Sequence, residues 1–479
     1  MIPVSFLWYD LETFGIDPRR SRIAQFAAQR TDEDLQPIDA PIVLFCRPAN
    51  DLLPSPAAAL VTGITPQQAR REGLREAEFI GRVLDEMTVP KTCTLGFNSL
   101  RFDDEFIRYS AWRSFHDPYE REWKNGNSRW DLLDVLRLAY ALRPDGIAWP
   151  RRDDGALTLK LTELTAANGI GHEHAHDALA DVHATIAMAR LLKAAQPRLF
   201  AYALTLRNKR IAGGLCDVAR MTPVLHVSGR YPGSRHHAAL VAPICMHPSI
   251  ANRVIAFDLD ADPQPLLELD AGDIADRLYT PSADLPDGVA RIPLKEIHLN
   301  RSPMLVSLSS LRAPDFQRLQ IDPDVACQRA DCLLRMPDLG EKVRAVFARP
   351  LSAGSDADAA IYEGFAPDTD KRLFPRIRAA APETLPTFAD QLRDRRLHEL
   401  LFRHQARNWP ETLDHTQQRR WNDYRRRRLV EDAGLSEYTF SRHAAEVAAL
   451  RTLHAGDGRA QVLLDAMDDW RNEISGDLH

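Results

Sequence analysis

No stretch of the sequence approaches the ~18 consecutive apolar residues that a membrane-spanning helix needs. The amino-terminal segment, MIPVSFLWYD, also lacks the basic residues that precede the apolar part of a secretory signal peptide. The sequence therefore predicts neither a membrane span nor an exported chain, and we expect a cytoplasmic protein.

Cysteine is scarce and scattered, and no two cysteines form a C-x-x-C pair. Without closely spaced pairs, the sequence has the pattern of neither a disulfide framework nor a zinc knuckle. We expect buried free thiols, because an unpaired cysteine behaves as a small apolar residue. The six residues are Cys46, Cys93, Cys216, Cys245, Cys327 and Cys332.

The chain has no excess of positive charge: its formal net charge is −6 and its pI is about 6.3. This balance excludes a strong, non-specific duplex binder, so any contact with nucleic acid must come from local patches. One candidate is the segment QQRRWNDYRRRRLVED, although a solvated helical face also explains it and is the interpretation we favour. Its arginines are Arg419, Arg420 and Arg425 to Arg428, around Trp421 and Tyr424.

A chain of 479 residues exceeds one ordinary hydrophobic core and predicts two or three domains. Residues 1–196 begin with three short strands in an expected antiparallel meander and continue with one more strand and several helices, which predicts an α/β unit. Residues 197–352 carry short β-like runs broken by Pro and Gly, which predicts a small all-β barrel with insertions. Residues 353–479 show helical periodicity and predict an all-α domain.

Two carboxylates interrupt the apolar first strand, VSFLWYDLE. Side chains at positions i and i+2 of a strand point the same way, so Asp10 and Glu12 are expected to project together. Adjacent carboxylates repel each other unless a cation joins them, and a divalent metal ion would do so. Taken alone, an exposed strand end with solvated acids explains the pair at least as well.

Three further residues extend this acidic set. Asp103 lies at an expected helix start in NSLRFDDEF, and His176 and Asp181 lie in HAHDALAD. Each motif alone is weak, but the order D-x-E, then D, then H-x4-D is a specific combination. Of the neighbouring polar residues, we expect Asp177 to cap a helix and Asp104 to be solvated, and we consider a zinc site at His172 and His174 the weaker interpretation.

At these motifs the chain resembles the DEDDh exonucleases, a superfamily with a ribonuclease H-like fold. WYDLETFG matches the first motif, NSLRFD the second and HDALAD the third. Further segments, among them QFAAQRTD, LVTGITPQQAR, NSRWDLLDVLR and ARNWPETLD, look like the bacterial exonuclease I family. The resemblance covers nearly the whole chain.

The resemblance implies a mixed-sheet exonuclease domain, an SH3-like β-barrel and a helical C-terminal domain. It also implies a monomeric enzyme of DNA repair and recombination that removes nucleoside 5′-monophosphates processively from the 3′ end of single-stranded DNA. Two Mg²⁺ ions, replaceable by Mn²⁺, would be held by Asp10, Glu12, Asp103 and Asp181, with Asp10 bridging both ions and Glu12 also near the scissile phosphate. His176 would be the general base, because its ordinary pKa lies near working pH.

The family pattern places contacts to the DNA strand on aromatic and basic side chains, which suit stacking and phosphate binding. The lysine at 160 departs from the arginine usual in the family, which puts a bidentate phosphate contact there in doubt. The family also binds the acidic tail of the single-stranded DNA-binding protein, for which Arg143 is a candidate, although a helix C-terminal charge explains it equally. The strand contacts are Glu12, Arg108, Tyr119, Trp123, Ser128, Arg137 and Lys160, whereas core packing explains Trp130 at least as well.

Two alternatives stay open. A nuclease of the same superfamily could act on RNA or in proofreading, which the C-terminal matches disfavour. A nucleic-acid-binding scaffold without catalysis is the other, and the presence of all four carboxylates and the histidine disfavours it.

Overall fold

The computed structural model describes residues 4–172, 177–348, 354–431, 434–476 and 478. The chain forms two compact units, which we treat separately. Unit 1 comprises residues 1–128, 172–184 and 351–479, and unit 2 comprises residues 129–171 and 185–350. Both units are therefore assembled from segments that are distant in the sequence.

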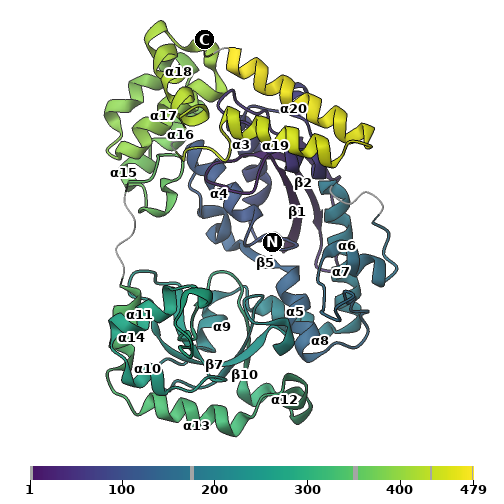
Figure 1. Cartoon of the computed structure of the whole chain (residues 1–479), viewed down its shortest axis with the longest axis vertical. Coiled ribbons are helices and arrows are strands. Elements are labelled where there is room, and N and C mark those ends of the chain that lie inside the picture. Colours follow the sequence, from purple (N-terminus) through teal and green to yellow (C-terminus); the bar gives the residue numbers. More distant parts are fainter. Residues whose placement is uncertain (1–3, 173–176, 349–353, 432–433, 477, 479) are drawn as a thin grey trace. The chain divides into compact units, whose positions relative to one another are not determined.

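A mixed sheet forms the centre of unit 1 (Figure 1). Its strands in this unit are β1 (Ser5–Thr13), β2 (Ile23–Thr31), β3 (Ile42–Phe45) and β4 (Thr92–Gly96), in the spatial order β3-β2-β1-β4. The first three strands are antiparallel, as the predicted meander requires, and β4 pairs parallel to β1. A further strand, β5 (Ser128–Asp131), begins at Ser128, the last residue of the first segment of unit 1.

Strand β1 is buried along most of its length. One of its faces packs into the core, and the other carries the two acids. Leu7, Tyr9 and Leu11 pack into a core cluster with residues of the helices α3 (Glu76–Met87) and α4 (Asp103–Arg113). Since successive side chains alternate, Asp10 and Glu12 lie on the opposite face.

Two short helices follow the meander, α1 (Pro56–Thr62) and α2 (Pro66–Glu72). The sequence explains where α2 begins: Thr65 Oγ1 accepts a hydrogen bond from the Gln68 amide at 3.1 Å, and Pro66 occupies the first turn. A proline fits there because the first amides of a helix have no intrahelical partner.

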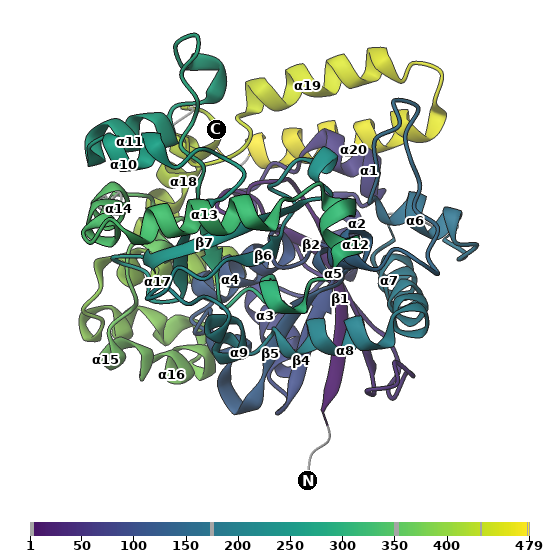
Figure 2. The ribbon, with the colours of Figure 1, turned by 90° about the horizontal axis from the view of Figure 1, so that it is seen from below.

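The C-terminal part of unit 1 is helical, as predicted. In Figure 2 two of its helices, α19 and α20, lie side by side, and both contact α1. Leu53 packs against Leu429, Trp470 and Ile474, so the two ends of the chain share one core cluster. The helices are α15 (Asp368–Lys371), α16 (Phe374–Ala379), α17 (Arg395–Asn408), α18 (His415–Leu429), α19 (Phe440–Leu453) and α20 (Gly458–Gly476).

The arginine-rich helix α18 corrects the interpretation as a wholly solvated face. Trp421, Arg425 and Arg428 are buried. The Arg425 guanidinium donates to the carbonyls of Asn50 (3.0 Å) and Ile474 (2.7 Å), and Arg428 Nε donates to the carbonyl of Asp51 (2.7 Å). These carbonyls replace the hydration that the guanidinium groups lose on burial. They belong to residues far away in the sequence, so the local sequence pattern does not reveal them.

Unit 2 contains a five-stranded antiparallel sheet in the order β10-β6-β7-β8-β9, with a core that includes Val224, Val241 and Ile297. Helices α10 and α11 are inserted between β8 and β9, as the prediction of a β domain with insertions allows. The helices α12 to α14 after β10 are not evident from the β-like sequence pattern. The strands are β6 (Val224–Val227), β7 (Ala238–Met246), β8 (Arg253–Asp258), β9 (Leu294–His298) and β10 (Met304–Ser307).

The other helices of unit 2 surround these strands in sequence. Among them, α5 contains the run after NSRW. They are α5 (Leu132–Leu142), α6 (Leu161–Ala167), α8 (Pro197–Thr205), α9 (Lys209–Gly214), α10 (Gln264–Glu268), α11 (Ala271–Tyr279), α12 (Ala313–Leu319), α13 (Pro323–Leu334) and α14 (Leu339–Phe347). Helix α7 (Ala178–Ala195) begins in unit 1 and ends in unit 2.

The predicted burial of the cysteines holds for Cys46, Cys93, Cys216 and Cys245. It is wrong for Cys332, which is exposed, and Cys327 is only partly buried. Both of these lie on α13, a helix that the sequence analysis did not anticipate. Within the described residues, no helix combines the length and the apolar character needed to cross a membrane.

Candidate metal centre

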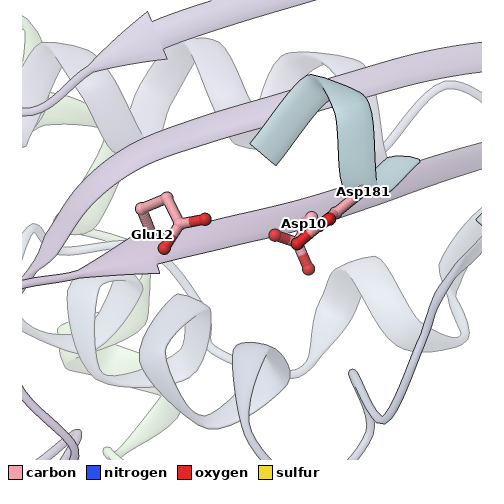
Figure 3. A group of neighbouring side chains, drawn as sticks. All are labelled: Asp10, Glu12 and Asp181. Atoms are coloured by element: carbon pink, nitrogen blue, oxygen red, sulfur yellow. The ribbon is translucent and has the colours of Figure 1, made fainter. Parts of the chain in front are cut away.

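Three carboxylates converge in unit 1. Asp10 and Glu12 come from β1 and Asp181 from the first turn of α7, and one oxygen of each lies within 4.8 Å of the others. Figure 3 shows Asp10 next to Asp181, with Glu12 further along the same strand. The structure therefore brings together three of the four acids that the sequence predicted as metal ligands.

The start of α7 places Asp181. Asp177 caps the helix as predicted, since its Oδ1 accepts a hydrogen bond from the Ala180 amide at 3.0 Å. Asp181 then falls in the first turn, where the helix dipole favours negative charge. His172 Nε2 lies 2.5 Å from Asp181 Oδ1, and this contact helps to orient the carboxylate.

The electrostatics of the group disfavour three free carboxylates. Burial raises the pKa of Asp10 well above its ordinary value, and the charge of Asp181 raises it further. Burial, together with the charges of Asp10, Asp181 and Asp177, raises the pKa of Glu12 to about 9. At neutral pH such a group either keeps protons or binds a cation.

The donor set fits a hard divalent cation. Carboxylate oxygens are the ligands that Mg²⁺ and Mn²⁺ prefer, and the separation of these three allows one ion to contact all of them. The energetic cost of placing the acids together is offset when a cation neutralises them. The geometry and the raised pKa values thus agree on a metal centre.

The fourth predicted ligand, Asp103, is not one of the three converging acids. It is buried at the first residue of α4, and its role as a metal ligand stays a prediction. The expectation for its neighbour Asp104 is wrong: this residue is 1% exposed and accepts hydrogen bonds from Tyr9 Oη (2.6 Å) and Arg121 Nη2 (2.5 Å). Asp104 therefore joins α4 to β1 and to a buried arginine.

The predicted general base, His176, lies outside the described residues, and so does His174. The weaker interpretation of a zinc site at His172 and His174 stays a prediction, because only His172 is described, and its ring contacts a carboxylate of the acidic group. The sequence analysis missed this role for His172. Its position nine residues before Asp181, in the loop leading to α7, was the available signal.

Among the predicted strand contacts in unit 1, Trp123 is the most accessible, with 65% of its surface exposed. Arg108 is buried, and its guanidinium bonds to Glu122 (2.7 Å) and Glu105 (2.9 Å) and lies 5.3 Å from the Tyr119 ring centroid. Arg108 thus holds the Tyr119 ring in place as well as carrying charge. Ser128 is partly exposed at the start of β5.

The C-terminal region contributes aromatic residues beside Tyr119 that the sequence analysis missed. The Phe365 ring meets the Tyr119 ring edge-on at 5.7 Å and is 77% exposed, and Tyr362 Oη accepts from Arg108 Nη1 at 3.0 Å. The aromatic residues of AIYEGFAPD, just after the expected start of the C-terminal domain at residue 353, were the signal. Stacking platforms of this kind suit single-stranded nucleic acid.

The remaining predicted contacts belong to unit 2. Arg137 Nη1 bonds to Asp134 at 2.7 Å, and a Cβ added to Gly229 would come within 2.8 Å of the Arg137 guanidinium carbon. Lys160 immediately precedes α6, where its exposed ammonium lies 3.4 Å from Glu163. Trp130 is fully buried and donates to the Ala203 carbonyl, so its role is core packing.

Arg143 follows the end of α5 and donates to the carbonyl of Leu142, as a helix C-terminal charge would. It also bonds to Asp315 at 2.6 Å while keeping 29% of its side chain exposed. Both interpretations given for this residue are compatible with this arrangement.

A mixed sheet that carries such a group of acids is typical of nucleases, and the family model "Exonuclease" matches residues 7–189. Two further models, "Exonuclease I SH3-like domain" and "Exonuclease I C-terminal domain", match residues 207–349 and 355–474. The chain belongs to the exodeoxyribonuclease I family. It combines an exonuclease domain, an SH3-like domain and a helical C-terminal domain, and it is a phosphodiester hydrolase.

Individual relatives agree over their whole length. Exodeoxyribonuclease I of Escherichia coli (strain K12) is 45% identical, with 98% of each chain covered. The solved structure of a moderately thermophilic exonuclease I from Methylocaldum szegediense is 46% identical, with a TM-score of 0.94 over 98% of this chain and 99% of that one. The zinc-bound E. coli ExoI–ssDNA complex is 44% identical, with a TM-score of 0.93 over 99% and 100%.

Proposed function

We propose that this enzyme is a processive 3′→5′ exonuclease that releases nucleoside 5′-monophosphates from single-stranded DNA. The observation that carries the proposal is the convergence of Asp10, Glu12 and Asp181 in a chain that matches exonuclease I over its whole length. The zinc-bound relative was solved with single-stranded DNA, which supports the same substrate here. The exposed Trp123 and the aromatic residues around Tyr119 offer stacking surfaces that tolerate any base sequence.

Asp10, Glu12 and Asp181 would hold divalent metal ions, with Asp103 as the fourth ligand. We propose two Mg²⁺ ions, with Mn²⁺ as a substitute, because the ligands are all carboxylates. When bound, such ions stabilise the attacking and leaving oxygens of a phosphodiester. In this chain, β1 and the first turn of α7 fix the carboxylates, and His172 orients Asp181.

We assign the general base to His176, on the basis of its place in the H-x4-D motif. His176→Ala is expected to lower kcat by ~10²–10⁴-fold, the range for a lost acid or base. The measurement is a pre-steady-state cleavage rate at saturating metal. Near-normal turnover in this variant would remove the assignment.

The remaining parts of the proposal concern the setting of the enzyme. We propose a monomeric cytoplasmic enzyme of DNA repair and recombination that binds the acidic tail of the single-stranded DNA-binding protein, with Arg143 as one contact. The Arg143 side chain, which is 29% exposed, supports this, because a basic group at the surface suits an acidic peptide. The domain boundaries near residues 197 and 353 also stay a prediction.

The first experiment follows a 5′-labelled single strand, the same strand in duplex, and an RNA counterpart, each with Mg²⁺ or with chelator. We expect a ladder of products that shortens from the 3′ end of single-stranded DNA, and only when metal is present. Equal attack on RNA would favour the second candidate, a related nuclease of RNA or proofreading. A chase with excess unlabelled DNA then measures processivity, since a processive enzyme finishes the strands it already holds.

A further inference from the structure

The loop that follows the two β1 carboxylates is held by the C-terminal region of the chain. The loop comprises residues 14–22, begins two residues after Glu12 and leads to β2. The pairing of β1 with β2 is irregular between Glu12 and Thr13, and past this point the Phe14 amide donates to the Arg22 carbonyl at 2.9 Å across the base of the loop. At its tip Ile16 is 81% exposed.

The segment between α18 and α19 supplies the first contact. The Glu437 carboxylate accepts a hydrogen bond from the Asp17 amide, and the Ile16 amide donates to it as well. A Cβ at Gly15 would overlap this carboxylate, so the approach requires a glycine at that position. The contact is thus specific to residues 420 positions apart in sequence.

Two more contacts hold the ends of the same loop. Arg428 Nη2 donates to the Arg20 carbonyl and Nη1 to the Leu435 carbonyl, both at 2.6 Å, so one buried guanidinium joins the loop to the Glu437 segment. The Tyr438 hydroxyl lies 3.2 Å from Ser55 Oγ, and the Ser55 amide donates to the Phe14 carbonyl at 2.6 Å. Glu437 is the contact that grips the exposed tip.

We propose that Glu437 is a positioning residue for the metal centre: by fixing the loop tip it restricts the Glu12 carboxylate to the conformation that binds metal. The inference rests on the proposed function. Glu437 does not contact the converging acids and acts through the loop backbone. A misplacement of about 1 Å at a reacting group can lower a rate by ~10²-fold. A contact that restricts the motion of the backbone next to a metal ligand therefore has a measurable effect.

The carboxylate is suited to this role because two peptide amides donate to it and because it is partly shielded from water. Burial raises the pKa of Glu437 to about 7, against the two amides that lower it, and the facing charges of Asp17 and Arg20 act in opposite directions. Protonation of this carboxylate weakens its hydrogen bonds to the two amides. A glutamine at this position keeps one acceptor oxygen and cannot lose it.

The test compares Glu437→Ala and Glu437→Gln with Glu431→Ala as the matched control, since Glu431 is an exposed glutamate just after the same helix, α18. We expect Glu437→Ala to lower kcat about tenfold with little change in KM for single-stranded DNA. It should raise the Mn²⁺ concentration that half-saturates the protein several-fold, measured by calorimetry without DNA. Glu437→Gln should recover most of both losses.

A second pair of variants guards against misfolding. Gly15→Ala displaces the same carboxylate from the loop side, and its Cβ would also lie 2.8 Å from Ser21 Oγ. The double variant Gly15→Ala/Glu437→Ala should lose less than the sum of the two single losses, because both changes remove the Glu437 contact. Additive losses would overturn the proposal, and so would Mn²⁺ binding and kcat equal to those of the Glu431→Ala control. The calorimetric result does not depend on cleavage. A wild-type enzyme that fails to digest DNA would therefore refute the proposed function, and the effect of Glu437 on Mn²⁺ binding could still be measured.

Discussion

Unit 1 contains two groups of buried or partly buried carboxylates that differ in their neighbours. Around Asp10 and Glu12 the neighbouring charges are other acids, and burial and repulsion together raise the pKa of both residues. Around Asp51 and Asp358 the neighbours are guanidinium groups: burial raises the pKa of each, but Arg407 and its neighbours outweigh it, and both pKa values lie below the ordinary range. Burial alone therefore does not decide the charge state of an acid.

The comparison distinguishes a structural cluster from a functional one. Arg407 bonds to Asp51 at 2.9 Å and to Asp358 at 2.8 Å, so the protein itself supplies the countercharge of this cluster. The first group has the charge pattern of a site whose cation comes from solution. Perturbed pKa values of this kind concentrate at functional sites.

The largest expected effect is loss of cleavage on removing one acid of the metal centre. Asp181→Ala should reduce exonuclease activity to background, because it removes the ligand that joins α7 to the β1 acids. Binding of single-stranded DNA in chelator, measured by fluorescence anisotropy, should persist. Retained turnover would contradict the assignment of Asp181 as a metal ligand.

The next effect concerns stability. Arg407→Ala leaves Asp51 and Asp358 buried with a lost partner, and breaking a buried pair of this kind destabilises by ~3–5 kcal/mol. The measurement is the urea midpoint of unfolding. Arg420→Ala is the control: Arg420 bonds to Glu399 at 2.5 Å, but the Arg420 side chain is 54% exposed and that of Glu399 is 32% exposed, and such surface pairs contribute less than ~1 kcal/mol. Equal shifts in the two variants would contradict the comparison.

The smallest effect is a difference in pH dependence. Because the pKa of Glu12 is raised in the folded protein, folding binds a proton there, and the stability of the chelated protein should fall as pH rises from about 4.5 towards about 9. Saturating Mg²⁺ should flatten this slope, and Glu12→Gln in chelator should remove part of it. Thermal unfolding between pH 5 and 9 is the measurement, with Glu431→Gln as the control.

The second group gives the opposite sign. The lowered pKa values of Asp51 and Asp358 contribute stability that is present above their ordinary pKa and is lost as pH falls through the folded values. This acid limb should persist in chelator, because the countercharges of Asp51 and Asp358 are the protein's own arginines. Loss of the acid limb in chelator would break the distinction between the two groups.

Much of the candidate site was predictable because it depends on local rules. Alternation along a strand placed Asp10 and Glu12 on one face, and helix capping identified Asp177. The order of the three motifs grouped Asp181 with these acids, and the resemblance to exonuclease I added its role as a metal ligand. Local rules suffice where partners are close in sequence.

Other features failed because their causes are distant in the chain. Asp104 was expected to be solvated, yet Tyr9 Oη donates to it across 95 positions. Arg425 and Arg428 look like a solvated run, and the carbonyls that accept from them belong to residues near position 50. The α12–α14 helices of unit 2 follow a β-rich stretch and carry no capping pattern that the sequence analysis singled out.

The shared core of the two chain ends sets the order of events during synthesis. Asp51 and Arg407 are separated by 356 positions, so at ~5–20 residues per second a ribosome needs roughly 20–70 s to make the partner after the acid has emerged. During that interval Leu53 lacks its C-terminal packing partners, and the loop after Glu12 lacks Glu437. A nascent chain is therefore expected to acquire a fully fixed metal centre only after its last helices have been translated.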